Sequence, residues 1–446
     1  ERYQNNDLLE QDTHRDISDW TDLLSTNIEY LSADTLTHQF KISYGLLTGT
    51  DEYNQHAHNS LGDLRTTDKD MGGHRHIVEA EYSLNLPKFV YRIGSQSYFS
   101  KMHENVRSKI NDNVNSKDES DFDVWETITG IYTSGRYTFR PNLSMYVGGR
   151  LEYTHYKYMI SQSVSKDIDW NFAPYLSLDW KVSTNYSASL YLTMKNERPG
   201  YFSMLPGRTY SNDDEYGIGN PFLKSSMQYE IEMKNLLFKY AVIELGARLE
   251  NNQFGTTYHL DDDGLRYTQP MNYADLLYLY GDISVPFSFC QGKVKGSLSL
   301  YLRNLSYHHV LDDIKSSAFD LNSDWYARGN LYAAYQPTDN FGIYINPSFH
   351  SQYNTLQVRK KGYMILDMGM QYTLPRNKQW SFALSVEDLF NQLKEESVYN
   401  YGGHHVTNTI LPNTQCLRFS LTYTISHAAK HIRIHKNEND ASRFMK

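Results

Sequence analysis

Residues 417 to 425 read Leu417-Arg418-Phe419-Ser420-Leu421-Thr422-Tyr423-Thr424-Ile425, so apolar and polar side chains alternate at every position. Successive side chains of a β-strand point to opposite faces of its sheet, so this alternation predicts a strand with one apolar and one polar face. The same pattern recurs at residues 380–387, 294–303, 143–153 and 39–46. Strands of soluble domains average about five or six residues, whereas a membrane strand needs roughly nine to eleven. The length of these segments therefore favours strands that cross a membrane.

The composition fits the same class of protein. The 446 residues include 38 tyrosines, and aromatic residues make up 14% of the chain. Yet the mean hydropathy is -0.63, which is the value of a polar chain. A membrane barrel explains both observations, because every second residue faces a polar lumen and aromatic girdles mark the two membrane interfaces. Soluble lectins and propellers can be equally rich in tyrosine, so composition alone leaves them as alternatives.

The sequence does not support a helical membrane protein, a nucleic-acid-binding protein or a metal site built on cysteines. No apolar run approaches the roughly 20 residues of a transmembrane helix, and residues 1–4 lack the features of a signal peptide. The net charge of -9 comes without a basic stripe, so we expect no nucleic-acid partner. The two cysteines, Cys290 and Cys416, have no metal-ligand spacing. We expect no cofactor.

The connections between the predicted strands alternate between two kinds. Tight turns lie at residues 32–34, 86–87, 140–142, 183–184, 238–239, 337–340 and 375–377. Long polar segments lie at residues 50–72, 103–123, 199–224, 253–270, 311–323 and 392–413. Short turns on one rim and long loops on the other are typical of the periplasmic and extracellular ends of an outer-membrane barrel.

These patterns predict an all-β fold, a large antiparallel transmembrane β-barrel with about 17 visible strands. Single-chain bacterial barrels close with an even number of strands, so the odd number indicates an N-terminal truncation of a barrel of about 22 strands. We divide the chain into a polar N-terminal segment (1–24), the barrel (25–428) and a basic polar tail (429–446).

Two linked motifs lie in the middle of the chain. The first is Lys195-Asn196-Glu197-Arg198-Pro199-Gly200-Tyr201, and the second is Gly219-Asn220-Pro221-Phe222-Leu223. They resemble the Arg-x-Pro and Asn-Pro-x-Leu boxes of TonB-dependent receptor barrels. Residues 386–391, which end in Leu389-Phe390-Asn391, resemble the penultimate strand of that family, and residues 418–423 resemble its closing strand. The high tyrosine content is similar to that of outer-membrane barrels of the Bacteroidetes type.

The resemblance implies uptake of a scarce nutrient through the outer membrane of a Gram-negative bacterium. In that family the TonB energy-transducing complex pulls on a plug domain inside the barrel. No plug or TonB box is recognisable before the first predicted strand, so energised transport would need a plug that is not present in this sequence. The expected partners are outer-membrane lipids and a small-molecule, glycan or peptide ligand. A surface lipoprotein is a further candidate partner.

Candidate ligand contacts follow from closeness to the two boxes and from position in the predicted loops. They are Arg198, Tyr201, Tyr210, Asn220, His308 and His309. Haem receptors of the family carry a histidine between the boxes, and this sequence has none there, which disfavours haem. Histidines two residues apart on a strand share one face, where they can bind one metal ion. The candidate metal ligands are His56, His58, His74 and His76, with an ordinary loop role as the alternative.

Two other functions stay open on the sequence. A passive porin, or a structural barrel of an outer-membrane assembly, would have the same wall. An outer-membrane hydrolase would place Ser and His or paired carboxylates near the outer rim. The sequence contains no Gly-x-Ser-x-Gly elbow, and no spacing singles out a triad, so we expect a protein that is not an enzyme.

Overall fold

The structure is a computed structural model, and it describes most of the chain. The described residues are 2–4, 7–9, 14–33, 37–58, 64–111, 113–114, 118–160, 163–212, 215–319, 324–376 and 378–425. The predicted C-terminal tail, residues 429–446, lies outside them. No helix in these ranges is long and apolar enough to cross a membrane.

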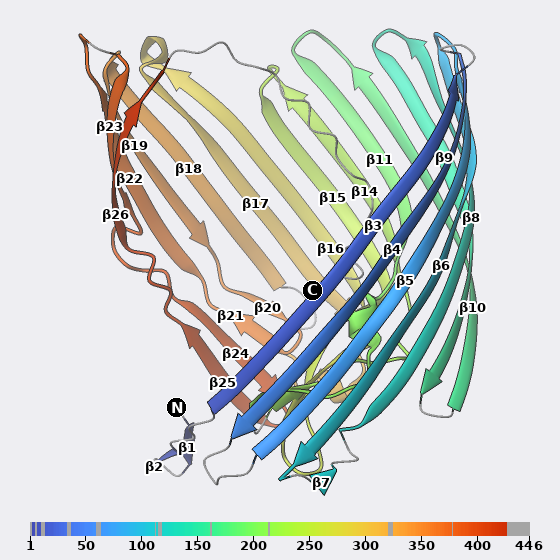
Figure 1. The fold of residues 1–446 in the computed structure, drawn as a ribbon. Helices are drawn as coiled ribbons and strands as arrows, with labels where there is room; N and C mark the ends of the chain where they lie inside the picture. Colours follow the sequence, from blue (N-terminus) through green and yellow to red (C-terminus); the bar gives the residue numbers. More distant parts are fainter. Residues whose placement is uncertain are drawn as a thin grey trace.

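Long antiparallel strands form the wall of a barrel, as the alternating sequence predicts (Figure 1). In the described ranges seventeen long strands make up the wall of the barrel. They are β3 (His14–Ala33), β4 (His38–His58), β5 (Leu64–Asn85), β6 (Phe89–Ile110), β8 (Ser120–Arg140), β9 (Leu143–Ile160), β10 (Ser163–Lys181), β11 (Tyr186–Glu197), β14 (Ser226–Leu237), β15 (Ala241–Leu260), β16 (Arg266–Phe289), β17 (Val294–His308), β18 (Asp324–Thr338), β19 (Phe341–His350), β22 (Tyr363–Thr373), β23 (Trp380–Glu387) and β26 (Cys416–Tyr423). The predicted strand number is therefore confirmed.

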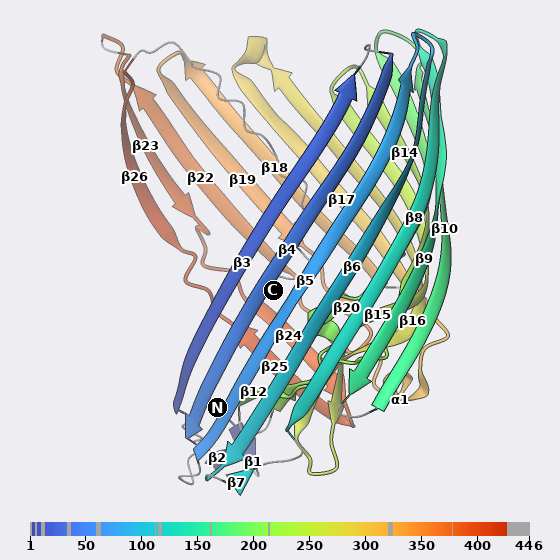
Figure 2. The same cartoon turned by 45° about the vertical axis from the view of Figure 1, so that its right-hand side comes forward.

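Antiparallel register pairs join each strand to the next, from β3–β4 round to β23–β26. The ring order then brings β26 next to β3. Because the number of wall strands is odd, these two strands run in the same direction. Residues 21–31 of β3 and all of β26 are exposed on both faces. β3 and β26 thus face each other across the seam of the ring (Figure 2).

Several strands are longer than the sequence pattern predicts. β5 has 22 residues and spans about 70 Å at about 3.3 Å per residue, far more than a hydrocarbon layer of about 30 Å. The predicted loops 50–72 and 253–270 are therefore mostly paired strand, with the pairs His58↔Leu64 and Leu260↔Arg266 next to their tips. Outside the lipid a strand needs no apolar face, so these parts lack alternation and read as loops. For the same reason β3 begins before the predicted boundary at residue 25.

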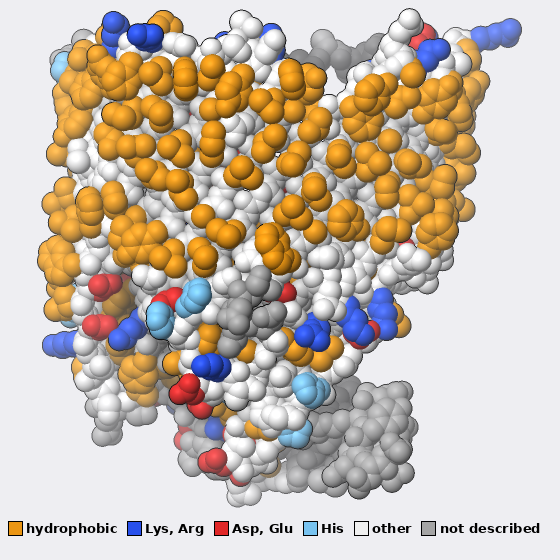
Figure 3. All heavy atoms as spheres, turned by 180° about the vertical axis from the view of Figure 1, so that it is seen from behind, with side chains coloured by type: hydrophobic (Ala, Val, Ile, Leu, Met, Phe, Trp, Pro, Cys, Tyr) orange, Lys and Arg blue, Asp and Glu red, His pale blue; other side chains and the backbone are white. Residues whose placement is uncertain are grey.

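The outer surface carries an apolar belt. Outward side chains such as Ile42 on β4, Leu151 on β9, Leu298 on β17 and Phe419 on β26 are 40–70% exposed. Figure 3 shows hydrophobic side chains as a broad band over the upper part of the visible face, with most of the charged and histidine side chains below it. The short turns lie at the top of Figure 1, next to the belt, and the long connections lie at the bottom. The belt is therefore the lipid-facing surface, and the lower rim is the extracellular end.

Smaller elements occupy the extracellular end. A four-stranded sheet contains β20 (Tyr353–Thr355), β21 (Val358–Lys360), β24 (Glu395–Tyr401) and β25 (His404–Ile410), so the predicted loop 392–413 holds a hairpin. The other small elements are β1 (Arg2–Gln4), β2 (Asp7–Leu9), β7 (Asn113–Val114), η1 (Tyr201–Met204), β12 (Thr209–Asn212), β13 (Glu215–Gly217) and α1 (Asp312–Lys315). A single-turn η2 (Cys290–Gly292) joins β16 to β17 at the opposite rim.

Candidate functional site

The loop between β11 and β14 folds back into the barrel. We call residues 199–224 the lumen loop; the structure describes all of them except 213 and 214. Figure 1 shows η1 of this loop inside the ring of strands. Tyr201, Met204 and Leu205 are at most 2% exposed. They pack on inward side chains of the wall, which are Met71, Met102, Phe122, Val124, Tyr156 and Tyr158.

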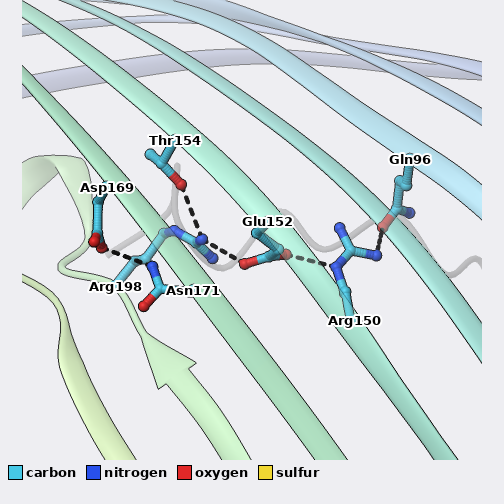
Figure 4. Close-up of polar contacts among 7 residues, drawn as sticks. All are labelled: Gln96, Arg150, Glu152, Thr154, Asp169, Asn171 and Arg198. Carbon is cyan, nitrogen blue, oxygen red and sulfur yellow. Dashed lines mark hydrogen bonds and ion pairs between the residues drawn. The ribbon is translucent and has the colours of Figure 1, made fainter.

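The first attachment of the lumen loop is Arg198, at the end of β11 (Figure 4). Its Nη2 lies 2.5 Å from the Glu152 Oε2 on β9 and donates a hydrogen bond of 3.2 Å to the Thr154 Oγ1. The other carboxylate oxygen of Glu152 accepts a bond of 2.6 Å from the Arg150 Nε, and Arg150 also donates to the Gln96 side chain. Glu152 therefore sits between two guanidinium groups.

The second attachment is Tyr201, whose hydroxyl donates a short hydrogen bond to Glu126 on β8. The Arg75 Nη2 lies 3.1 Å from the Tyr201 hydroxyl and 3.6 Å from the Glu126 Oε2. The Glu126 side chain is fully buried, and the Arg75 side chain is only 5% exposed. A buried carboxylate is tolerated only when charge and hydrogen bonds compensate its lost hydration. Arg75 and Tyr201 supply both.

Two further carboxylates hold the middle of the loop. The Gly207 backbone N–H donates a bond of 2.9 Å to Glu104 on β6, which also pairs with Lys69 at 2.8 Å. The loop approaches the wall so closely here that a Cβ on Gly207 would lie 2.4 Å from the Val106 Cγ2. Any larger residue at this position would force either the loop or the Val106 side chain to shift.

Asp118 makes the last of these attachments. Its Oδ1 accepts a hydrogen bond of 2.9 Å from the Tyr210 hydroxyl and lies 3.3 Å from the Arg208 Nη1. The Arg65 guanidinium stacks 3.7 Å above the Tyr210 ring. We call Glu104, Asp118, Glu126 and Glu152 the four anchor carboxylates. Together they hold the chain from Arg198, which directly precedes the lumen loop, to the middle of the loop.

The second sequence box closes the base of the loop. The Asn220 side chain donates to the Pro270 carbonyl oxygen at 3.2 Å and accepts from the Phe222 N–H at 3.0 Å. The Gly219 N–H donates to the Leu205 carbonyl oxygen at 2.9 Å, and a Cβ on Gly219 would lie 2.3 Å from that oxygen. The Asn-Pro-x-Leu box thus fixes the end of the loop to its middle and to β16.

Four of the six predicted ligand contacts therefore come together in the lumen loop or at its first end. Arg198, Tyr201, Tyr210 and Asn220 all have partners in the protein, and Tyr201 and Tyr210 are 1% and 5% exposed. A ligand reaches these two rings only if the loop moves. His308 and His309 lie apart from them at the end of β17 and are exposed. The His309 Nδ1 lies 2.7 Å from the Asp275 Oδ2.

The anchor carboxylates themselves were missed by the sequence analysis. Of the four, Glu152 was placed on the polar face of a predicted strand, whereas Glu104 and Asp118 fall within the predicted long loop 103–123. Their partners lie 46 to 103 residues away in the chain, and no local pattern indicates such pairs.

The candidate metal ligands do not form one site. His74 and His76 point outward from β5, with ring centroids 5.4 Å apart, and the Tyr44 hydroxyl lies 2.8 Å from the His76 Nδ1. His56 pairs with Thr66, eight residues from His74 along β5, or about 26 Å. The side chain of His58 lies outside the described part. The described residues contain no group of three or more His, Cys, Asp or Glu side chains that could hold a metal ion.

Comparisons with known proteins agree with this architecture. The sequence matches the outer membrane protein beta-barrel family over residues 29–423. No curated protein matches it. Three solved structures resemble the fold: the ferric citrate transporter FecA (TM-score 0.62, 13% identity), the ferric yersiniabactin uptake receptor FyuA from Yersinia pestis (0.59, 10%) and the copper transporter OprC (0.55, 10%).

The alignments cover 90–91% of this chain, but only 62% of FecA, 61% of FyuA and 72% of OprC. The chain thus spans about three fifths of the length of FecA and FyuA. At these identities the likeness concerns the fold alone. Together with the family match it confirms, at the level of the fold, the resemblance to TonB-dependent receptor barrels that the two boxes indicated. The chain belongs to the outer membrane protein beta-barrel family and lies in the outer membrane of a Gram-negative bacterium.

Proposed function

We propose that this chain is the receptor barrel of an outer-membrane uptake system, in which extracellular loops capture a nutrient and the lumen loop controls its passage inward. The observation that carries the proposal is the attachment of the lumen loop to four buried or half-buried carboxylates. A passive porin needs an open aqueous channel. A loop that fills part of the lumen and is tied by charged hydrogen bonds suits a gated pathway instead.

In this proposal the six candidate contacts have two roles. His308 and His309 are accessible at the extracellular end and meet the ligand first. Arg198, Tyr201, Tyr210 and Asn220 hold the lumen loop closed and contact the ligand once the loop moves. Energised passage further requires a plug and the TonB complex, as in the family that the sequence resembles. Outer-membrane lipids surround the belt, and a surface lipoprotein would act at the extracellular rim.

The test is a conductance measurement in planar lipid bilayers. We compare the wild-type chain with a variant in which residues 200–218 are replaced by a short Gly-Ser linker. The proposal expects the loop-deleted variant to conduct at least about tenfold more than the wild type, because the tethered loop narrows the channel. Equal and large conductance of both proteins would support the passive porin and overturn the gated pathway.

A second measurement addresses uptake in the cell. Deletion of the gene should slow growth on a limiting nutrient, and the wild-type gene should restore it. A variant with Glu126→Leu and Glu152→Leu, which loosens the loop at two anchors, should admit a bulky antibiotic that the wild type excludes. Unchanged growth on every nutrient source and unchanged antibiotic sensitivity would argue for a structural barrel.

A further inference from the structure

Two arginines face the lumen on β17 and β18, away from the lumen loop. Arg303 is opposite Tyr326 in the register of these strands, and Arg328 is opposite Tyr301. Leu302, next to Arg303, and Trp325, three residues before Arg328, are exposed on the lipid side, so Arg303 and Arg328 belong to the inward face. Arg328 is exposed within the lumen, and Arg303 is half-buried.

Tyrosine rings hold both guanidinium groups. The Arg303 Cζ lies 4.8 Å from the ring centroid of Tyr326 and 4.8 Å from that of Tyr353, which belongs to the extracellular sheet. The Arg328 Cζ lies 4.9 Å from the ring of Tyr301. Stacking of this kind covers the flat face of a guanidinium group and leaves the N–H donors at its edge available. The tyrosine rings therefore hold both guanidinium groups in place, and the N–H donors of these groups stay available to a ligand.

Arg303 and Arg328 differ from the arginines near the lumen loop in their contacts with carboxylates. Arg75, Arg150, Arg198 and Arg208 each lie within 4 Å of a carboxylate oxygen. In the described part of the chain, neither arginine of the β17–β18 pair has such a contact. The Arg303 Nε is moreover shielded from solvent and has no hydrogen-bond partner. Unpaired guanidinium groups in a partly enclosed lumen favour an anionic partner.

A cavity of about 340 Å³ has Arg328 in its lining, and Arg303 lies outside that lining, two residues further along the register of the same two strands. It is lined by Asp282, Tyr301, Arg328, Asn330, Ser348 and His350, among others. The volume suits a small solute. Asn330 and Ser348 supply neutral donors and acceptors, whereas the Asp282 carboxylate accepts hydrogen bonds and repels a second anionic group. The cavity thus suits a solute with one anionic end and hydroxyl groups elsewhere.

We propose that this cavity and the Arg303–Arg328 pair form a lumenal binding site for a hydroxyl-bearing anion, such as a sugar phosphate or sugar acid. The guanidinium edges receive the phosphate or carboxylate, and the hydroxyl groups face Asp282, Asn330 and Ser348. The inference rests on the proposed function, since it names the chemical class of solute that passes through this lumen.

The experiment measures binding of glucose 6-phosphate to the detergent-solubilised full chain at low ionic strength by equilibrium dialysis. Arg303→Gln and Arg328→Gln should each weaken binding by about tenfold or more, because each removes a charged hydrogen-bond donor. The matched control is Arg248→Gln. Arg248 also faces the lumen and stacks on Tyr278 at 4.7 Å, but it lies opposite Glu230 in the register. Its replacement should change the affinity less than about twofold.

Further readouts separate binding from folding. Circular dichroism and heat-dependent gel mobility verify that each variant is a folded barrel, and Arg303→Lys keeps the charge if Arg303→Gln fails to fold. Neutral glucose should bind at least about tenfold more weakly than glucose 6-phosphate. Absence of saturable binding to the wild type, or equal affinities of wild type and both arginine variants, would overturn the site. A growth defect on gene deletion would still stand in that case, so the two proposals fail separately.

Discussion

At the scale of single residues, the structure depends on buried charges that are matched one by one. Glu126 is the clearest case, since its carboxylate lies between Arg75 and Tyr201 in a part of the lumen without solvent contact. The sequence predicted Tyr201 as a ligand contact, because it follows the Arg-x-Pro box. It did not predict the partner, which is 75 residues away in the chain. Alternation indicates the face on which a residue lies, but the partner across the lumen depends on how the loop folds.

We therefore expect Glu126→Leu to destabilise the folded barrel by about 3 to 5 kcal/mol, because it removes the buried carboxylate that pairs with Arg75 and accepts the Tyr201 hydrogen bond. Urea unfolding of the protein in lipid vesicles, followed by tryptophan fluorescence, measures this change. The control is Glu244→Leu, since Glu244 pairs with the half-exposed Lys234 and its loss should cost at most about 1 kcal/mol. Equal effects of the two substitutions would show that the Glu126 network adds nothing specific.

At the scale of elements, the alternating pattern predicted the membrane parts of the strands and missed their extensions. β4 and β5 continue as a paired hairpin to His58 and Leu64, where the sequence has polar residues on both faces. A strand with lipid on one face and water on the other needs alternating apolar and polar residues, whereas a strand with water on both faces does not. The extracellular sheet was missed for a similar reason. It is a short assembly held by backbone pairs and by charges such as Glu396, which lies between Lys361 and Lys394.

This sheet gives a pH prediction. The hydrogen bond from Lys361, and then that from Lys394, lowers the pKa of Glu396 below its ordinary value of 4.5. The folded state thus favours the carboxylate, and the stabilisation is present above pH 4.5 and is lost as the pH falls through the lowered pKa. A ¹³C NMR titration of the Glu396 carboxyl group should give a midpoint below 4.5.

The matched variant carries Lys361→Met and Lys394→Met together. Its Glu396 midpoint should return toward the ordinary value. A wild-type midpoint at or above that of the variant would contradict the role of the two lysines.

At the scale of the whole molecule, the structure assigns the two rims. Short turns such as the one at residues 141–142 lie beside the apolar belt, and the tips of the long hairpins lie far from it. The strand number and the sorting of the connections were predicted from the sequence, because the lipid and the two rims impose regular patterns on the chain. The inward fold of the lumen loop was not, since residues 199–224 carry no periodic signal.

The assignment of the rims predicts which epitope tags are accessible on intact cells. A tag inserted between Asp262 and Asp263, at the tip of the β15–β16 hairpin, should bind antibody on unbroken cells. A tag between Pro141 and Asn142, in the β8–β9 turn, should bind only after the outer membrane is permeabilised. The reverse pattern would show that the barrel is inserted the other way round.

The most direct test of the membrane assignment is a spin-label scan of β17 in lipid vesicles. Exposed Cys290 and Cys416 are first replaced by serine, and single cysteines are then introduced at Ser297, Leu298, Ser299 and Leu302 for labelling. The labels at 298 and 302 should be relaxed by oxygen dissolved in the lipid, and those at 297 and 299 by a water-soluble nickel complex. Shielding of positions 298 and 302 from both agents, as between two packed sheets of a soluble protein, would contradict a lipid-facing barrel.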